Sequence, residues 1–299
     1  MLTTPEPSTV AAQLREVLPK LPKAEQRVAR ALLAGYPTVG LEPLAAVAKL
    51  ARTSAATVLR LAYRLGFEGY PELQQALKRE TQQRYASPLA QYGAAEAGDQ
   101  ESVGVMARSR SVLLDATTMT FDQLPEGELV RAAELISDRS RRVSAAGGRF
   151  SDMLARYLIA HLHQLRPNTA HVGGATSDHA AYLLDVGRRD VLVLFDYRRY
   201  QRETIMLARQ AAAKDAKIIL LTDPWLSPAA AVADVVLPAQ VTSPSPFDSL
   251  TPALAVIETL VAAVVEQLGE SGRERVAQYD QMAGDVLRDD GDWAGASAT

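Results

Sequence analysis

The sequence predicts two domains of different fold class: an all-α helix-turn-helix bundle, then an α/β domain whose doubly wound parallel sheet has helices on both faces. Two observations predict this. Residues 10–84 carry apolar side chains at helical spacing, whereas from residue 141 short apolar runs alternate with helical patterns, the order typical of a parallel sheet. With 299 residues, each domain is large enough to bury a core of its own.

The composition narrows the class of protein. There is no cysteine, so disulfides and thiolate chemistry are excluded, and the net charge is −3. The first ten residues lack the basic and apolar regions of a signal peptide. The longest apolar run, 253–268, contains Glu258 and Glu266 and is too short to span a bilayer, so we expect a buried helix. A cytoplasmic protein without membrane contact is expected.

Residues 43–66 have the pattern of a helix-turn-helix. A first short helix has an apolar stripe, residues 51–53 form the turn, and Ser54 is suited to cap the second helix. In that second helix the spacing i, i+3, i+4 and i+7 predicts one buried face, formed by Val58, Leu61, Ala62 and Leu65. Gly66 is expected to end it. Such a second helix lies in the major groove of DNA in helix-turn-helix proteins.

Charge favours DNA binding over the alternative, a helical bundle that binds no nucleic acid. Between Thr9 and Glu80 there are eleven lysines and arginines against six glutamates, a charge of +5 in a chain of −3. We therefore expect double-stranded DNA as a partner. The candidate contact residues lie in the turn and on the remaining face of the second helix: Arg52, Thr53, Ser54, Ala55, Thr57, Arg60 and Arg64.

The other elements follow in order. Helices over 10–18 and 23–34, separated by Pro19 and Pro22, and over 72–84 complete the first domain, residues 1–85. Small residues without periodicity predict a linker at 86–101. The second domain, 102–299, is expected to have strands at 141–146, 169–172, 191–195, 217–222 and 232–238, and helices at 102–121, 126–136, 151–165, 178–184, 204–213, 251–268 and 274–288.

The first domain resembles the DNA-binding domain of the RpiR/MurR transcriptional regulators. The resemblance covers about seventy residues and is strongest in SAATVLRLAYRLGFEGYPEL, residues 54–73, with Arg60 and the Gly66-Phe67 pair in place. One departure is Arg52, where the family usually has glycine. If φ is positive there, an arginine is strained, although it adds a cation beside the DNA backbone.

The second domain resembles the SIS (sugar isomerase) domain that follows this module in the same regulators. Gly147, Ser151 and Ala155 carry the resemblance, together with the strand pattern and DAKIILLTD…SPAAAVADVVLP. It implies a phosphosugar held by hydroxyls on two loops. In the first loop, of pattern Gly-x-Gly-x-Ser, Arg149 stands where the second glycine would be. The second loop, residues 196–201, has none of the usual hydroxyl positions.

Arginines in these loops favour an anionic effector, either a sugar phosphate or a carboxylate, because guanidinium groups bind both. The candidate ligand-binding residues are Gly147, Gly148, Arg149, Ser151, Asp196, Arg198, Arg199 and Gln201. Alternatively, Asp196 pairs with Arg149 or Arg198 inside the fold, and the domain only dimerises. A different ligand or a phosphosugar isomerase are further alternatives, although the loops supply no convincing catalytic base.

We therefore expect a DNA-binding transcriptional regulator, not an enzyme, that responds to a small anionic metabolite. No cofactor is expected, and no metal, because His161 and His163 stand two apart on a helix and point to different faces. A homodimer or homotetramer is expected, since one helix-turn-helix buries little DNA surface and a two-fold pair reads a palindrome.

Overall fold

The computed structural model describes residues 9–85 and 104–289, so the expected linker 86–101 lies outside the described residues. The chain divides into two compact units, a helical one from its N-terminal part and an α/β one from its C-terminal part. Each unit is described by itself.

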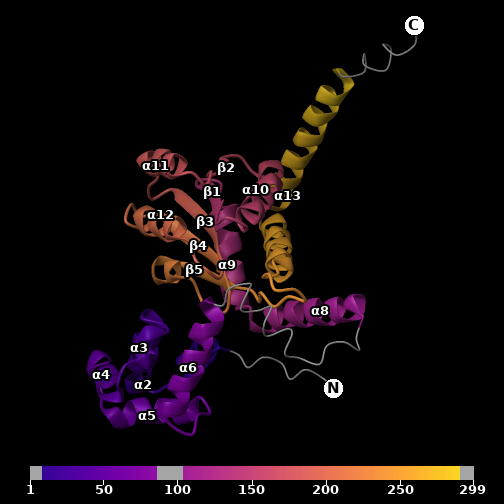
Figure 1. Ribbon diagram of the computed structural model, residues 1–299. Coiled ribbons are helices and arrows are strands. Elements are labelled where there is room, and N and C mark those ends of the chain that lie inside the picture. The colour runs from indigo at the N-terminus through magenta and orange to yellow at the C-terminus, as the bar shows by residue number, and fades with distance from the viewer. Residues whose placement is uncertain (1–8, 86–103, 290–299) are drawn as a thin grey trace. The chain divides into compact units, whose positions relative to one another are not determined.

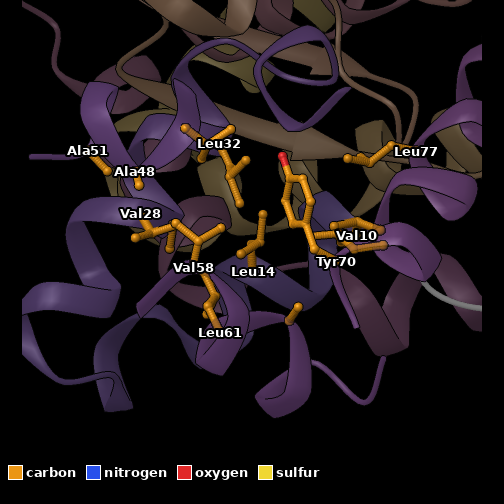
Figure 2. Close-up of a cluster of buried hydrophobic side chains, with 14 of the residues drawn as sticks. Val10, Leu14, Val28, Leu32, Ala48, Ala51, Val58, Leu61, Tyr70 and Leu77 are labelled. Atoms are coloured by element: carbon orange, nitrogen blue, oxygen red, sulfur yellow. The ribbon is translucent and has the colours of Figure 1, made fainter. Parts of the chain in front are cut away.

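The helical unit confirms the predicted all-α bundle. Its helices are α1 (Val10–Val17), α2 (Lys23–Ala34), α3 (Thr38–Leu41), α4 (Leu44–Leu50), α5 (Ala55–Arg64) and α6 (Tyr70–Tyr85). The four-residue helix α3 was not predicted, because one turn is too short to show a period. The side chains that face one another across the bundle form a single core, shown in Figure 2, which includes Leu14, Leu32, Val58, Leu61 and Leu77.

The turn between α4 and α5 has the geometry of a Schellman motif. The Arg52 amide donates to the Lys49 carbonyl (3.1 Å) and the Thr53 amide donates to the Ala48 carbonyl (2.9 Å). This motif requires a left-handed residue, and Arg52 takes that position with a φ of 49°. The positive φ foreseen for this departure from the family pattern is therefore present.

The end of α5 is closed in the same way. The amides of Gly66 and Phe67 donate to the carbonyls of Tyr63 (3.0 Å) and Ala62 (3.1 Å), and Gly66 has a φ of 91°. Gly66 thus ends the helix as predicted. The first of these motifs forms the turn between α4 and α5, and the second ends α5, so that the two packed helices form a helix-turn-helix.

A buried carboxylate joins distant parts of this bundle. Glu80 of α6 accepts a hydrogen bond from the Val10 amide at the start of α1 (2.8 Å) and another from the Tyr36 hydroxyl. Burial raises the pKa of Glu80 to about 7, against the lowering effect of the Val10 hydrogen bond. The charged form of Glu80 is therefore disfavoured in the folded protein.

The α/β unit has the predicted parallel sheet. Five strands, β1 (Arg142–Gly147), β2 (Thr169–His171), β3 (Asp190–Asp196), β4 (Lys217–Thr222) and β5 (Val235–Pro238), pair in the order β2-β1-β3-β4-β5, all parallel. Every residue of the central strand β3 is buried, as its continuous apolar run predicted. The segment 232–238, expected as one strand, begins as a strand only at Val235, because residues Pro228–Val232 form a 3-10 helix.

Helices cover both faces of this sheet (Figure 1). Helices α9 (Glu126–Ser137), α10 (Asp152–Leu165) and α13 (Thr251–Asp289) pack together on one face, and α11 (Thr176–Asp185) and α12 (Arg202–Ala212) on the other. Helix α8 (Val105–Gln123) precedes α9. Successive side chains of β3 point to opposite faces of the sheet. Leu192 and Leu194 therefore lie on the same face and pack in the core with α12.

Helix α13 bends at Gly269, which has a φ of 52° and divides it into the two helices that were predicted. Its first half is a core helix, with Val256, Ile257, Leu260 and Val264 buried. By length and composition alone, residues Thr251–Gly284 would be able to cross a membrane, but the core helices of water-soluble proteins pass the same test.

Candidate DNA interface and candidate ligand site

Helix α5 has two clearly different faces. Its buried face consists of Thr57, Val58, Leu61 and Ala62. Its exposed face consists of Ala55, Ala56, Arg60, Tyr63 and Arg64. The apolar residues thus hold the helix on the bundle and leave a solvent-facing surface with two small side chains at its leading end.

Ser54 and Thr57 shape that leading end through their hydroxyls, and Ser54 is also exposed whereas Thr57 is buried. The Ser54 hydroxyl caps α5 by accepting a hydrogen bond from the Thr57 amide (3.3 Å). The two hydroxyls are also 3.0 Å apart, and the Thr57 hydroxyl accepts from Arg60 Nη2 (3.1 Å). Thr57 is only 3% exposed. Of the residues predicted to contact DNA, Thr57 is therefore placed to orient Arg60.

Two further hydrogen-bonded arginines surround this surface. Arg64 Nε donates to Glu25 Oε2 at 2.9 Å, and the Glu25 side chain is buried in α2 while that of Arg64 is half exposed. The Arg27 side chain, from α2, donates to the carbonyls of Ala51 (3.4 Å) and Arg52 (3.3 Å). It therefore stabilises the turn between α4 and α5. Arg52 itself is exposed and Thr53 partly exposed. Helix α2 thus supports both ends of the candidate DNA interface.

Sequence reasoning missed Tyr63, which is 54% exposed on α5. It lies three residues after Arg60 and seven after Ala56, so all three share one stripe. The same helical spacing that revealed the buried face would have revealed this residue.

The first ligand loop runs from the end of β1 to the start of α10. Ser151 is 6% exposed, and its hydroxyl donates to the Phe195 carbonyl at the end of β3 (2.7 Å) while accepting from the Gly148 amide (2.9 Å). Gly147 is needed for close approach, because a Cβ there would lie 2.6 Å from the backbone of Ser151 and Asp152. The Ser151 hydroxyl, expected to face an anion, is thus used inside the fold.

The second ligand loop follows β3 and is held by Asp196, which is 1% exposed. Its carboxylate accepts from the Gln201 amide (3.3 Å) and from the Ser227 hydroxyl, and its carbonyl accepts from the Thr222 hydroxyl (2.6 Å). Thr222, the last residue of β4, and Ser227, in the loop after it, were not predicted. The rule that the carboxyl ends of parallel strands meet at one edge identifies Thr222 as a candidate.

The structure brings the two loops together. The Arg149 amide donates to Gln201 Oε1 (3.2 Å), and the Gln201 side chain lies against Gly148. The Arg149 guanidinium is exposed and lies 5.2 Å from the centre of the Phe150 ring. Arg199 is exposed with a φ of 66°, and Arg198 is partly buried. Three arginines therefore lie on two loops that touch each other at the carboxyl edge of the sheet.

Other polar groups at this edge form pairs without metal-site geometry. His171 Nε2 lies 2.6 Å from Asp152 Oδ1, and Arg156 donates to the other oxygen of Asp152 (2.8 Å). Within residues 9–85 and 104–289, no group of three or more acidic or histidine side chains is arranged to hold a metal ion.

Comparison with known proteins assigns both units. Residues 8–84 match the model of the helix-turn-helix domain of the rpiR family, and residues 135–263 match the SIS domain model. Together these matches cover more than two-thirds of the chain. A search of curated proteins finds no match.

Solved structures agree on the fold. The sugar isomerase domain of an RpiR transcription factor from Sphaerobacter thermophilus is 24% identical, with a TM-score of 0.56 over 58% of this chain and 97% of that chain. The NanR protein of Vibrio vulnificus, complexed with ManNAc-6P, is 20% identical, with a TM-score of 0.54 over 92% of this chain and 98% of that one. An Escherichia coli CFT073 protein in complex with A5P is 20% identical, with a TM-score of 0.50 over 61% and 99%.

An rpiR-type helix-turn-helix, here α4 and α5 with their two Schellman motifs, thus precedes a five-stranded parallel sheet that matches the SIS model. The order of the two domains is the one that the family resemblance implied. The chain therefore belongs to the rpiR family of helix-turn-helix proteins that carry a SIS domain.

Proposed function

We propose that this protein is a cytoplasmic transcriptional regulator that binds operator DNA through α5 and an anionic metabolite through its SIS domain. The observation that carries the proposal is the exposed face of α5, with small residues at its leading end and cations beside it, in a chain that also has a SIS domain. We place the DNA-binding domain at 1–85, the linker at 86–101 and the effector domain at 102–299.

Charge and geometry support DNA as the partner. Arg52, Arg60 and Arg64 are exposed around α5, and each retains N–H groups beyond those used within the fold. Arginines prepositioned in this way lose less freedom on contacting phosphates. Because phosphate neutralisation dominates such binding, the affinity should fall steeply with added salt.

The ligand site is supported by what the loops leave available. Among the described residues, the amides of Phe150 and Ser151, just before α10, have no hydrogen-bond acceptor, and the exposed Arg149 side chain belongs to the same loop. Amides at the start of a 14-residue helix favour an anion. Two structures of this fold are complexes with the sugar phosphates ManNAc-6P and A5P. We retain a sugar phosphate or a carboxylate as the ligand class.

One observation favours a second function, a SIS domain that only dimerises. The Ser151 hydroxyl and the Asp196 carboxylate both have partners inside the fold, so neither needs a ligand. The same observation argues against isomerase activity, because a buried, hydrogen-bonded Asp196 is poorly placed to act as a base. We therefore propose a regulator and not an enzyme.

The DNA-binding claim is tested by selecting duplexes from random DNA with the full-length protein and measuring their affinity by fluorescence anisotropy. We expect Arg60→Ala with Arg64→Ala to weaken binding at least tenfold. The matched control is Arg131→Ala with Arg209→Ala, two exposed arginines of the α/β unit, which should leave the affinity unchanged. Equal affinity of both double variants would refute the assignment of α5.

The ligand claim is tested by thermal shift with ManNAc-6P, A5P and a set of dicarboxylates, since a ligand that binds only the native state stabilises it. Any stabilisation should be lost in Arg149→Ala and kept in Arg188→Ala, whose exposed arginine precedes β3 at the opposite edge of the sheet. If a compound stabilises Arg149→Ala as much as the wild type, the ligand does not bind at the loops 147–151 and 196–201. No stabilisation by any compound would favour the dimerisation scaffold.

A further inference from the structure

The exposed face of α5 is largely apolar where it would meet the bases. Ala55 and Ala56 form its leading end and are both exposed, and the ring of Tyr63 lies two turns further along the same stripe as Ala56 and Arg60. In a helix-turn-helix the leading residues of the second helix contact base edges in the major groove. Here those residues offer methyl groups.

Several polar side chains around this leading end make hydrogen bonds within the helical unit. The Ser54 hydroxyl caps the Thr57 amide and contacts the Thr57 hydroxyl, which in turn accepts from Arg60. Arg64 is held by Glu25. The Ser54 and Thr57 hydroxyls nearest to Ala55 and Ala56 thus shape the helix, and Arg60 is the charged residue on the stripe of Ala56, Arg60 and Tyr63.

In the major groove of DNA, thymine alone presents an apolar group, its C5-methyl, which alanine methyls and aromatic rings contact. We propose that α5 recognises thymine methyl groups through Ala55 and Ala56, with the ring of Tyr63 as a further apolar contact, so that each operator half-site contains thymines at these positions. This inference rests on the proposed DNA binding and adds the chemical class of the sequence that is read.

The test replaces thymine by uracil, one position at a time, in a duplex selected with the full-length protein. Uracil pairs as thymine does and lacks only the methyl group, so the change isolates the apolar contact. Loss of one buried methyl corresponds to a decrease in affinity of about fourfold. We expect this decrease at one or two thymines in each half-site and no effect at the other thymines.

Variants then locate the contact on the protein. Ala55→Gly and Ala56→Gly remove the methyl groups from the protein side, so each should bind the thymine duplex about fourfold more weakly and no longer distinguish uracil from thymine at its position. Ala45→Gly is the matched control for Ala56→Gly, because Ala45 is an exposed alanine at the second position of α4. Ala45→Gly should still bind the uracil duplex about fourfold more weakly than the thymine duplex.

Tyr63 is tested by Tyr63→Phe, which keeps the ring, and Tyr63→Leu, which removes it. Phenylalanine should preserve the affinity, whereas leucine should lower it. If duplexes are enriched but uracil is tolerated at every position, or if the uracil effect persists in both glycine variants, the inference is wrong while DNA binding stands. If no duplex is enriched, the proposed DNA binding itself fails and this inference fails with it.

Discussion

Arg52 stands in a backbone conformation that glycine adopts at lower energy. Its φ of 49° is set by the two hydrogen bonds that close the turn between α4 and α5, and the Arg27 guanidinium holds its carbonyl. A side chain in this left-handed region costs about 1–2 kcal/mol per residue. Within the described part of the chain, the exposed guanidinium makes no hydrogen bond or ion pair that would require an arginine, which agrees with a role in binding DNA.

Arg52→Gly should therefore stabilise the helical unit by about 1 kcal/mol and weaken DNA binding, whereas Arg52→Ala should weaken DNA binding without the gain in stability. Urea unfolding followed by circular dichroism measures the first effect and anisotropy the second. If Arg52→Gly is less stable than Arg52→Ala, the left-handed conformation is not maintained in solution.

Glu80 gives the helical unit a pH dependence. Burial raises its pKa from 4.5 to about 7, so the folded state binds its proton more tightly than the unfolded state does. The favourable contribution of the protonated form is complete below pH 4.5 and is lost as the pH rises through 7. From pH 5 to pH 8 the free energy of unfolding should fall by about 2–3 kcal/mol on this account.

Glu80→Gln preserves an acceptor for the Val10 amide but cannot ionise. The variant should be more stable than the wild type at pH 8 and close to it at pH 5. Urea unfolding of both proteins at the two pH values isolates the contribution of Glu80, because the other groups are common to both. A difference that does not depend on pH would contradict the raised pKa.

At the level of secondary-structure elements, the junction of β1 and α10 depends on one glycine and not on its neighbour. A Cβ on Gly147 would lie 2.6 Å from the backbone of Ser151 and Asp152, whereas one on Gly148 would lie 3.2 Å from the end of the Gln201 side chain. Backbone atoms at a helix start have little room to move, but a glutamine side chain can change its rotamer.

We therefore expect Gly147→Ala to destabilise the α/β unit by at least about 2 kcal/mol and to abolish ligand binding by displacing α10 from the sheet. Gly148→Ala should change the stability by less than about 0.5 kcal/mol. Thermal unfolding monitored by circular dichroism measures both. Similar stability of the two variants would show that the approach of α10 to β1 is looser than described.

Elements with a clear period were predictable from sequence. The stripe of α5, the cap at Ser54, the end at Gly66 and the buried run of β3 each follow from local chemistry. The one-turn helix α3 and the start of β5 at Val235 were not, because they depend on packing and on the 3-10 helix before β5.

The ligand site was predictable only in part. The loops after β1 and β3 could be placed at one edge, since parallel neighbours end together. The roles of the polar side chains in these loops could not be predicted from the sequence. Ser151 is hydrogen-bonded to Phe195, 44 positions away in the chain, and Asp196 to Ser227, 31 positions away. The exposed position of Tyr63, in contrast, follows from the helical period of α5 alone.

For the whole molecule, we expect a dimer or tetramer formed through the effector domain. The apolar side chains of 253–268 are largely buried within their own unit, where α13 packs against α9 and α10, so we expect the interface to use other surface. Two DNA-binding domains in one dimer read a palindrome. Sedimentation at micromolar concentration should show at least a dimer, and a monomer with full operator affinity would contradict this expectation.

The central claim is that one chain couples an anion site at the 147–151 and 196–201 loops to DNA binding by α5. Coupled sites change each other's affinity by the same factor, typically 5–150-fold. The most direct test is the affinity of the full-length protein for its selected duplex, measured by anisotropy with and without the metabolite that stabilises it in the thermal-shift screen. We predict at least a fivefold change that is absent in Arg149→Ala. An affinity that stays the same at saturating metabolite would contradict the account.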